Sequence, residues 1–202
     1  MIAALFSLVL LFAGPFWESK PPMEWPDMEL EALLTDSPWA QVMGSPSTAV
    51  SAPGVQAYFA TASPMMAAEK EAERRAKLRR KPGKEVPESP EANDYRDWLE
   101  ENRTTQLVLA VRIESNRGFS DEAEVKRMEE ESVMKVGKRK FKMTGHFPPN
   151  AADPYLRIAF PRQAALSDKT LSFDLYLPGV PAPFRNAEFK LKDMQVDGKL
   201  DL

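Results

Sequence analysis

The chain has 202 residues, of which 43% are hydrophobic and 28% are charged, which suits one soluble domain with a packed core and a small appendage. Its formal net charge of −3 argues against a general nucleic-acid binder, because such proteins normally present a basic surface. The absence of cysteine excludes disulfides, thiolate catalysis, iron–sulfur clusters and cysteine-based zinc sites.

The first element in chain order is an apolar leader. Residues 2–13 are apolar apart from one serine, and a Gly-Pro pair follows them. This run is shorter than the ~20 residues that span a bilayer as a helix, and it has the length of a signal-peptide core. We therefore expect residues 1–20 to be a signal peptide cleaved near Ala13. The mature protein would be exported, periplasmic or secreted, with no membrane span; an uncleaved anchor or a buried helix is the alternative.

Residues 21–64 are expected to form a short helix, a turn and a loop. Asp27 is a suitable N-cap, the next residues carry an apolar stripe, and the Ser37-Pro38 pair stops the helix. Trp39 follows the stop directly. Within the later Ser-, Pro- and Ala-rich stretch, residues 55–59 alternate as a strand does.

Residues 65–104 are expected to form a charged helical insertion or linker outside the core. Between residues 69 and 84 there are eight Lys/Arg and three Glu, whereas residues 85–102 contain seven Asp/Glu and one Arg. Large apolar residues are few in both stretches. A solvated helical arm, neutralised by its own acidic continuation, is the structure that this pattern favours.

Residues 105–202 are expected to form the main domain. Apolar and polar residues alternate over several stretches, which is typical of half-buried antiparallel strands. The Asp197-Gly198 pair is a strong signal for a type I′ hairpin. One helix is expected after Ser120, running to Val136 with Gly137 beyond its end. The fold class is therefore α+β, mainly antiparallel β, as a small sheet or sandwich with one packed helix. The strand-like stretches are residues 107–113, 138–143, 155–160, 170–177 and 187–192.

Two stretches resemble a family of uncharacterised exported bacterial proteins. One is the Leu-Leu-Thr-Asp-Ser-Pro-Trp-Ala turn at residues 33–40, and the other is the C-terminal segment from Phe189 to Leu202. The resemblance implies export and this order of elements, and it carries no activity. The residues of these motifs expected to have structural roles are Asp36, Ser37, Pro38, Trp39, Asp193, Asp197 and Gly198.

No catalytic site is predicted. His146 is the one histidine, it follows no nucleophile motif, and strand-end packing or a surface position is expected for it. Among the thirty Asp and Glu residues, Asp36 and Asp193 are of most interest because they lie in the family-like motifs. A structural role is favoured for both, as part of a turn and of a strand end respectively. Phosphate-loop, dinucleotide and EF-hand patterns are missing, so neither cofactor nor metal is expected.

Two groups of residues are candidates for interactions. The basic run suits a polyanion, and its main candidates are Arg74, Arg75, Arg79 and Arg80. Trp39 and Trp98 are candidates for an aromatic contact, since tryptophan is frequent in binding hot spots.

The sequence as a whole favours a non-catalytic exported module, with a structural role or a protein partner in the cell envelope. Two alternatives stay open: an envelope hydrolase that uses paired carboxylates, and an exported domain with an arm that contacts polyanions. The sequence does not indicate an oligomeric state.

Overall fold

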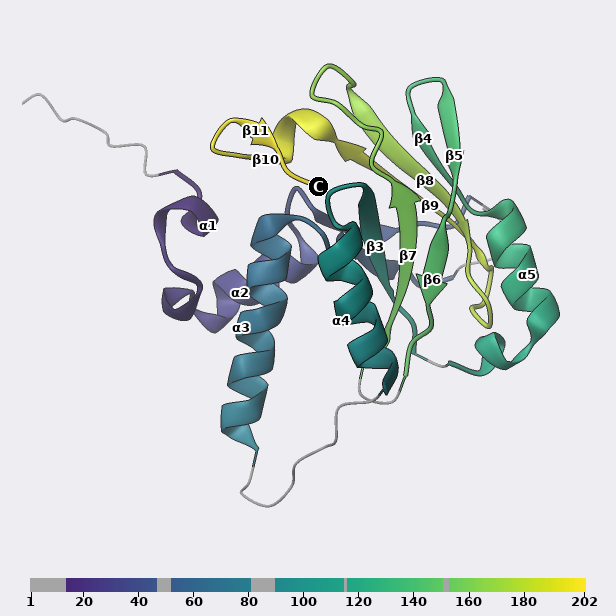
Figure 1. The fold of residues 1–202 in the computed structure, drawn as a ribbon, viewed down its shortest axis with the longest axis horizontal. Helices are drawn as coiled ribbons and strands as arrows, with labels where there is room; N and C mark the ends of the chain where they lie inside the picture. Colours follow the sequence, from purple (N-terminus) through teal and green to yellow (C-terminus); the bar gives the residue numbers. More distant parts are fainter. Residues whose placement is uncertain (1–13, 47–51, 81–89, 115, 151–152) are drawn as a thin grey trace, which may run out of the picture.

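The computed structural model describes residues 14–46, 52–80, 90–114, 116–150 and 153–202, and it gives no side-chain placement for residues 90–93. The expected leader at residues 2–13 and the segment 81–89 lie outside these ranges. The fold is α+β with mostly antiparallel strands, as predicted (Figure 1). The helices are α1 (Phe16–Ser19), α2 (Asp27–Thr35), α3 (Ser63–Arg79), α4 (Pro90–Asn102) and α5 (Glu122–Glu131), with 3-10 turns η1 (Pro22–Glu24), η2 (Asn116–Ser120) and η3 (Leu191–Asp193).

One sheet is five-stranded and antiparallel, in the order β1-β2-β3-β7-β6. Its central strands are buried on both faces: every residue from Leu107 to Val111 in β3 is buried. A strand that is apolar on both sides must be covered by two layers. The strands are β1 (Ala40–Met43), β2 (Val55–Phe59), β3 (Gln106–Arg112), β6 (Gly145–Phe147) and β7 (Tyr155–Pro161).

The second sheet, β5-β4-β8-β9, covers one face of the first. In β8 the inward residues Leu171, Phe173 and Leu175 are buried and alternate with partly exposed polar residues. Phe59 of the first sheet packs against Phe189 of the second with ring centroids 4.7 Å apart, so the main core lies between the sheets as in a sandwich. The strands are β4 (Val133–Val136), β5 (Arg139–Lys142), β8 (Thr170–Tyr176) and β9 (Phe184–Lys190), and a separate hairpin consists of β10 (Gln195–Val196) and β11 (Lys199–Leu200).

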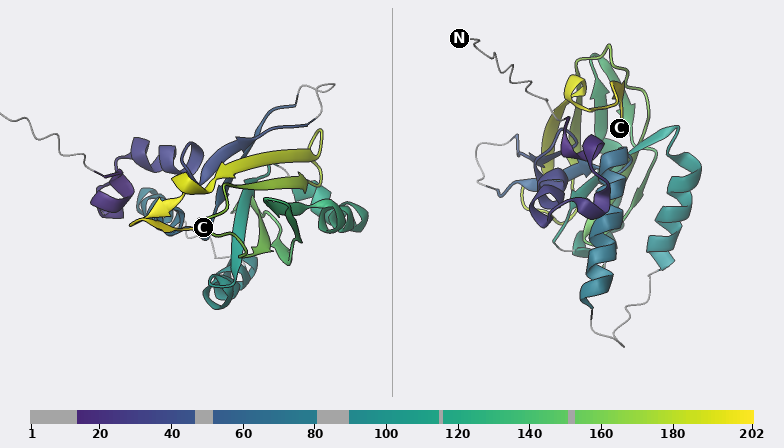
Figure 2. Two further views of the ribbon diagram at one scale, coloured as in Figure 1. Left: turned by 90° about the horizontal axis from the view of Figure 1, so that it is seen from above. Right: turned by 90° about the vertical axis from the view of Figure 1, so that its left-hand side faces the viewer.

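Helices α3 and α4 cover the other face of the five-stranded sheet, which differs from the solvated arm expected for residues 65–104. Met65 and Ala68 of α3 have no exposed surface, and the half-buried Trp98 of α4 stacks on Phe147 with ring centroids 5.3 Å apart. Several apolar residues of this charged region therefore serve packing, whereas Leu78 of α3 is exposed. Figure 2 shows both helices against the sheets, with α5 at the opposite end of the molecule from α1.

Helix α5 is shorter than predicted. It ends at Glu131 rather than Val136, and residues 133–136 form β4. Gly137, expected just beyond the helix, has φ of +59° and lies in the turn between β4 and β5. At the far end of the chain, Asp197 and Gly198 have φ of +50° and +72°, as the predicted type I′ hairpin requires. Within the described ranges, no helix has the length and apolar character needed to cross a bilayer.

Candidate functional site

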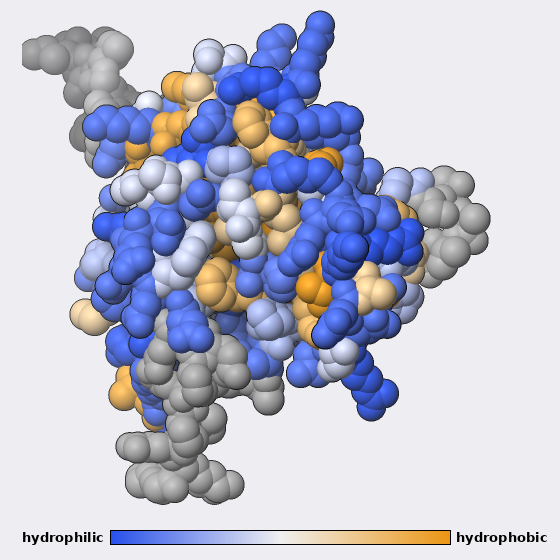
Figure 3. All heavy atoms as spheres, turned by 45° about the vertical axis from the view of Figure 1, so that its right-hand side comes forward, coloured by the Kyte–Doolittle hydropathy of each residue, from blue (hydrophilic) through white to orange (hydrophobic). Residues whose placement is uncertain are grey.

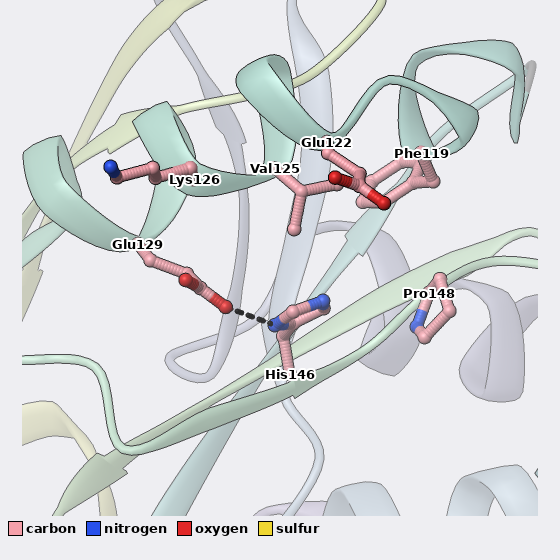
Figure 4. Close-up of a pocket in the computed structure, with 7 residues that line it drawn as sticks. All are labelled: Phe119, Glu122, Val125, Lys126, Glu129, His146 and Pro148. Carbon is pink, nitrogen blue, oxygen red and sulfur yellow. Dashed lines mark ion pairs between the residues drawn. The ribbon is translucent and has the colours of Figure 1, made fainter.

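An open groove of about 530 Å³ lies between α5 and β6. Its apolar lining comes from Phe119, Val125 and Pro148, and none of these three is fully buried. The polar lining comes from the charged side chains of Glu122, Lys126 and Glu129 and from the imidazole of His146 (Figure 4). Figure 3, which brings the α5 side forward, shows separate hydrophobic patches among hydrophilic residues on this face. Apolar centres with charged surroundings are the usual composition of a protein-binding surface.

The position of α5 follows from its sequence and its contacts. Asp121 is the N-cap, and its carboxylate accepts a 2.9 Å hydrogen bond from the backbone N–H of Ala123. On the inner side Met128 is fully buried, and the hydroxyl of Tyr176 in β8 donates to Glu124 at 2.8 Å. The helix is therefore anchored on the second sheet, and the neighbouring side of the helix, with Glu122, Val125 and Glu129, is turned toward β6.

Phe119 enters the groove from η2, which is positioned by a close backbone contact. Gly118 lies directly against Gly179 in the β8–β9 loop, and a Cβ on Gly118 would overlap the backbone of Pro178 and Gly179. Glycine is needed at position 118 because only a residue without a side chain permits this approach.

His146 faces Glu129 across the groove, with 3.6 Å between Nδ1 and Oε1. Burial lowers the pKa of the His146 imidazole below its ordinary value of 6.5, although the carboxylate of Glu129 acts in the opposite direction. The imidazole is therefore neutral at neutral pH. Lys126 points away from it (Figure 4). His146 is the middle residue of β6 and is partly buried, whereas the sequence favoured strand-end packing or a surface position for it.

A second, more polar depression of about 460 Å³ lies where β1 approaches β9. The two strands are joined by a bridge between Gly44 and Asn186, and Gln41 spans the gap by donating from Nε2 to the carbonyl of Glu188 at 2.9 Å. The backbone groups here are already engaged by the protein itself, so the α5–β6 groove is the better candidate site.

The two family-like motifs are brought together in space. The indole Nε1 of Trp39 donates to the carbonyl of Asp201 at 2.7 Å, and the Asp201 carboxylate accepts from the backbone N–H of Ser63 at 2.9 Å. Asp197 joins the same region by donating its backbone N–H to Glu18 at 3.3 Å. The motifs thus connect the N-terminal helices to the C-terminal hairpin.

The individual motif residues have structural positions. Asp36 is the exposed C-cap of α2. The turn hydrogen bond is accepted by the side chain of Ser37 and not by that of Asp36, at 3.3 Å from the backbone N–H of Trp39. Pro38 lies in this turn, Asp193 ends η3, and Asp197-Gly198 forms the last hairpin turn. Trp39 itself is fully buried, so it cannot be the surface contact that was considered for it.

Three of the four arginines considered for polyanion binding are engaged in ion pairs within the fold. Arg74 and Arg75 both donate to Glu71, at 2.7 Å and 2.6 Å, and Arg79 donates to Asp27 at 2.8 Å. Arg75 also reaches Asp27 at 2.5 Å, so these pairs fasten α3 to α2. The sequence suggests that the acidic residues after the basic run neutralise it. The partners of these three arginines are instead Glu71 and Asp27. Arg80 is the exposed C-cap of α3.

These ion pairs give a prediction about pH. Hydrogen bonds from Arg74 and Arg75 lower the pKa of Glu71 from 4.5 to about 2. Because the folded state favours the ionised carboxylate, Glu71 stabilises the fold fully above pH 4.5, and this contribution is lost as the pH falls toward 2. We expect Glu71→Gln to lower the melting temperature at neutral pH, and we expect the difference from wild type to shrink below pH 4.5. Thermal melts over this range test it, with the exposed Glu101→Gln as the matched control; a difference independent of pH would contradict it.

A buried polar network under α3 and α4 was not foreseen from the sequence. Arg157 of β7 is paired with Asp153 and, at 3.0 Å, with Glu69 of α3, while the hydroxyl of Tyr58 donates to the same Glu69. The guanidinium of Arg157 also lies 4.6 Å from the ring centroid of Tyr95 in α4. Burial alone would lower the pKa of Arg157, but the negative charge of Glu69 helps to outweigh burial and raise it. The network holds both helices on the sheet, and the only sequence signal for it was an arginine amid the apolar residues of a strand.

Three carboxyl groups of the described residues, Asp27, Glu71 and Glu73, have a pKa that neighbouring basic side chains lower. A general acid needs a raised pKa, as in glycosidases. Across the described part of the chain, no group of three or more His, Asp or Glu side chains has a geometry that could hold a metal ion.

Comparison of this chain with models of protein families, with curated proteins and with solved structures finds no match.

Proposed function

We propose that this protein is a non-catalytic exported module that binds a protein partner in the cell envelope through the α5–β6 groove. The observation that carries the proposal is the composition of the groove: Phe119, Val125 and Pro148 form an apolar centre among the side chains of Glu122 and Glu129. An apolar centre with a charged rim suits a protein surface better than a small substrate, which usually needs a pocket that encloses most of its area.

The state of the ionisable groups supports binding rather than catalysis. His146 is neutral and its nearest charged neighbour is a carboxylate at 3.6 Å, with no hydroxyl nucleophile among the residues that line the groove. The arginine pairs of α3 support the same proposal, because basic groups engaged with Glu71 and Asp27 are less free to contact a polyanion. Export is supported by the apolar leader and by the family resemblance of the two motifs.

The proposal is tested by site-directed photocrosslinking in the cells that make the protein. A photoreactive phenylalanine is placed at Lys126 on the groove rim, and in a matched variant at Lys70, an exposed lysine on α3. We expect an envelope protein to crosslink from position 126 and not from position 70. Equal products at both positions, or none from position 126, would overturn the groove as the contact.

The same preparation tests export. N-terminal sequencing of the crosslinked chain, after separation of periplasm from cytosol, is expected to give a mature N-terminus near Gly14 in the periplasmic or secreted fraction. An intact N-terminus in the cytosol would refute the exported part of the proposal.

A further inference from the structure

The groove carries an excess of negative charge. Residues 121–131 include six carboxylates and two basic side chains. Two of the carboxylates are balanced within α5, because Glu131 pairs with Arg127 at 2.7 Å and Glu130 with Lys126 at 3.9 Å.

The two carboxylates of the groove are not balanced in this way. Among the described residues, Glu122 has neither a hydrogen-bond nor an ion-pair partner, and Glu129 has only the imidazole of His146, which is neutral at neutral pH. Both belong to the groove lining, whereas the third charged group of the lining, Lys126, pairs with Glu130. The rim therefore bears two unbalanced negative charges that call for positive charges on a partner.

The spacing of these charges defines the partner further. Positions 122 and 129 are two helical turns apart, which corresponds to ~10 Å along α5. Val125 lies between them, with Phe119 next to Glu122 and Pro148 on the other side of the groove (Figure 4). An extended chain covers ~10 Å in about three residues, at ~3.3 Å per residue. Side chains of an extended chain alternate between its two faces, so two basic side chains four positions apart, with an apolar residue midway between them, match the groove.

The strand beside the groove favours an extended partner. Strand β6 is the last strand of its sheet and pairs only with β7 among the described strands. An edge strand offers backbone N–H and C=O groups to an added segment. Pro148 directly follows β6, so such pairing is confined to a few residues.

We propose that the α5–β6 groove binds an extended, cationic–apolar peptide segment of its partner, with basic side chains on Glu122 and Glu129 and an apolar side chain on Val125. This rests on the proposed binding function and names the chemistry of its ligand. Nucleic acids and anionic lipid headgroups carry the charge sign that these carboxylates repel.

The test uses a phage-displayed library of random dodecapeptides, selected on the purified full chain. We expect enriched peptides to carry lysine or arginine on both sides of an apolar residue. Binding of the most enriched peptide is then measured by fluorescence anisotropy at low and high salt. Glu122→Gln/Glu129→Gln is expected to weaken binding about tenfold, as for the loss of two solvent-accessible charge pairs, and high salt is expected to weaken the wild type more than this variant.

The matched control is Glu100→Gln/Glu101→Gln in α4, which removes two exposed helical carboxylates away from the groove and is expected to leave affinity unchanged. Selection of acidic or uncharged peptides, failure to select any, or equal affinity of both double variants would overturn the inference. A crosslinked partner at position 126 without cationic peptide binding would reject this ligand chemistry and leave the binding function standing. Cationic peptide binding without a crosslinked partner at position 126 would reject the envelope partner and leave the ligand chemistry standing.

Discussion

Substitution of Trp39 by alanine is expected to lower the free energy of unfolding by about 4 kcal/mol, the usual cost of removing a large buried aromatic. The indole is fully buried, packs edge-on against Trp17 with centroids 5.4 Å apart, and donates to the carbonyl of Asp201 at 2.7 Å. The variant therefore loses apolar contacts and leaves a partly buried carbonyl without its donor. For a domain of this size the melting temperature is expected to fall by about 10 °C.

The matched control is Trp98→Ala. Trp98 is only half-buried and contacts Phe147 on one side, so we expect about half the loss or less. Chemical denaturation of both variants provides the free energies. A Trp39→Ala protein within about 1 kcal/mol of wild type would show that the motif tryptophan does not anchor the C-terminal segment.

Replacement of Arg157 by methionine is expected to cost about 3 kcal/mol, because it removes the shared cation of a buried network. Glu69 and Asp153 would remain close together without their partner, under α3 and α4. The side chains of Glu69 and Asp153 are 25% and 31% exposed. Water can therefore partly solvate the two carboxylates, and the expected loss of stability is at the low end of the range for a broken buried ion pair. Amide exchange is expected to accelerate most in α3 and α4, since the network holds these helices on the sheet.

The double variant Arg157→Met/Glu69→Gln separates this cause from a loss of packing. We expect it to regain part of the stability, since the uncompensated carboxylate is removed together with its cation. Equal stability of the single and double variants would attribute the loss to packing. A single variant as stable as wild type would show that the network contributes nothing to helix docking.

A strand such as β8 could be predicted because only one of its faces meets the core. In β8, Leu171, Phe173 and Leu175 alternate with Thr170, Ser172 and Asp174, and a period of two has no other common explanation. The end of α5 could not be predicted in this way. Val136 fits the helical spacing from Val125 and Met128 and also the strand alternation with Met134, and Gly137 suits a helix end as well as a hairpin turn.

The groove was beyond the reach of the sequence for a different reason. It exists because β6 pairs with β7 and lies opposite α5, and no local pattern encodes that pairing. The burial of Arg185 could not be predicted either, because it also depends on how the strands are assembled. Arg185 occupies an inward position of β9 with 1% exposure, although a charged residue in a strand is normally expected on the outer face.

Helix α1 sets a limit on maturation of the chain. Phe16 lies 5.5 Å from Trp25 and Trp17 lies 5.4 Å from Trp39, measured between ring centroids, so both rings belong to the folded domain. A leader peptidase that cut after residue 20 would remove two aromatic anchors and expose the indoles beneath them. A cleavage that leaves this fold intact would therefore fall before Phe16 and not at residue 20, the expected end of the leader, and it would keep α1 in the mature protein.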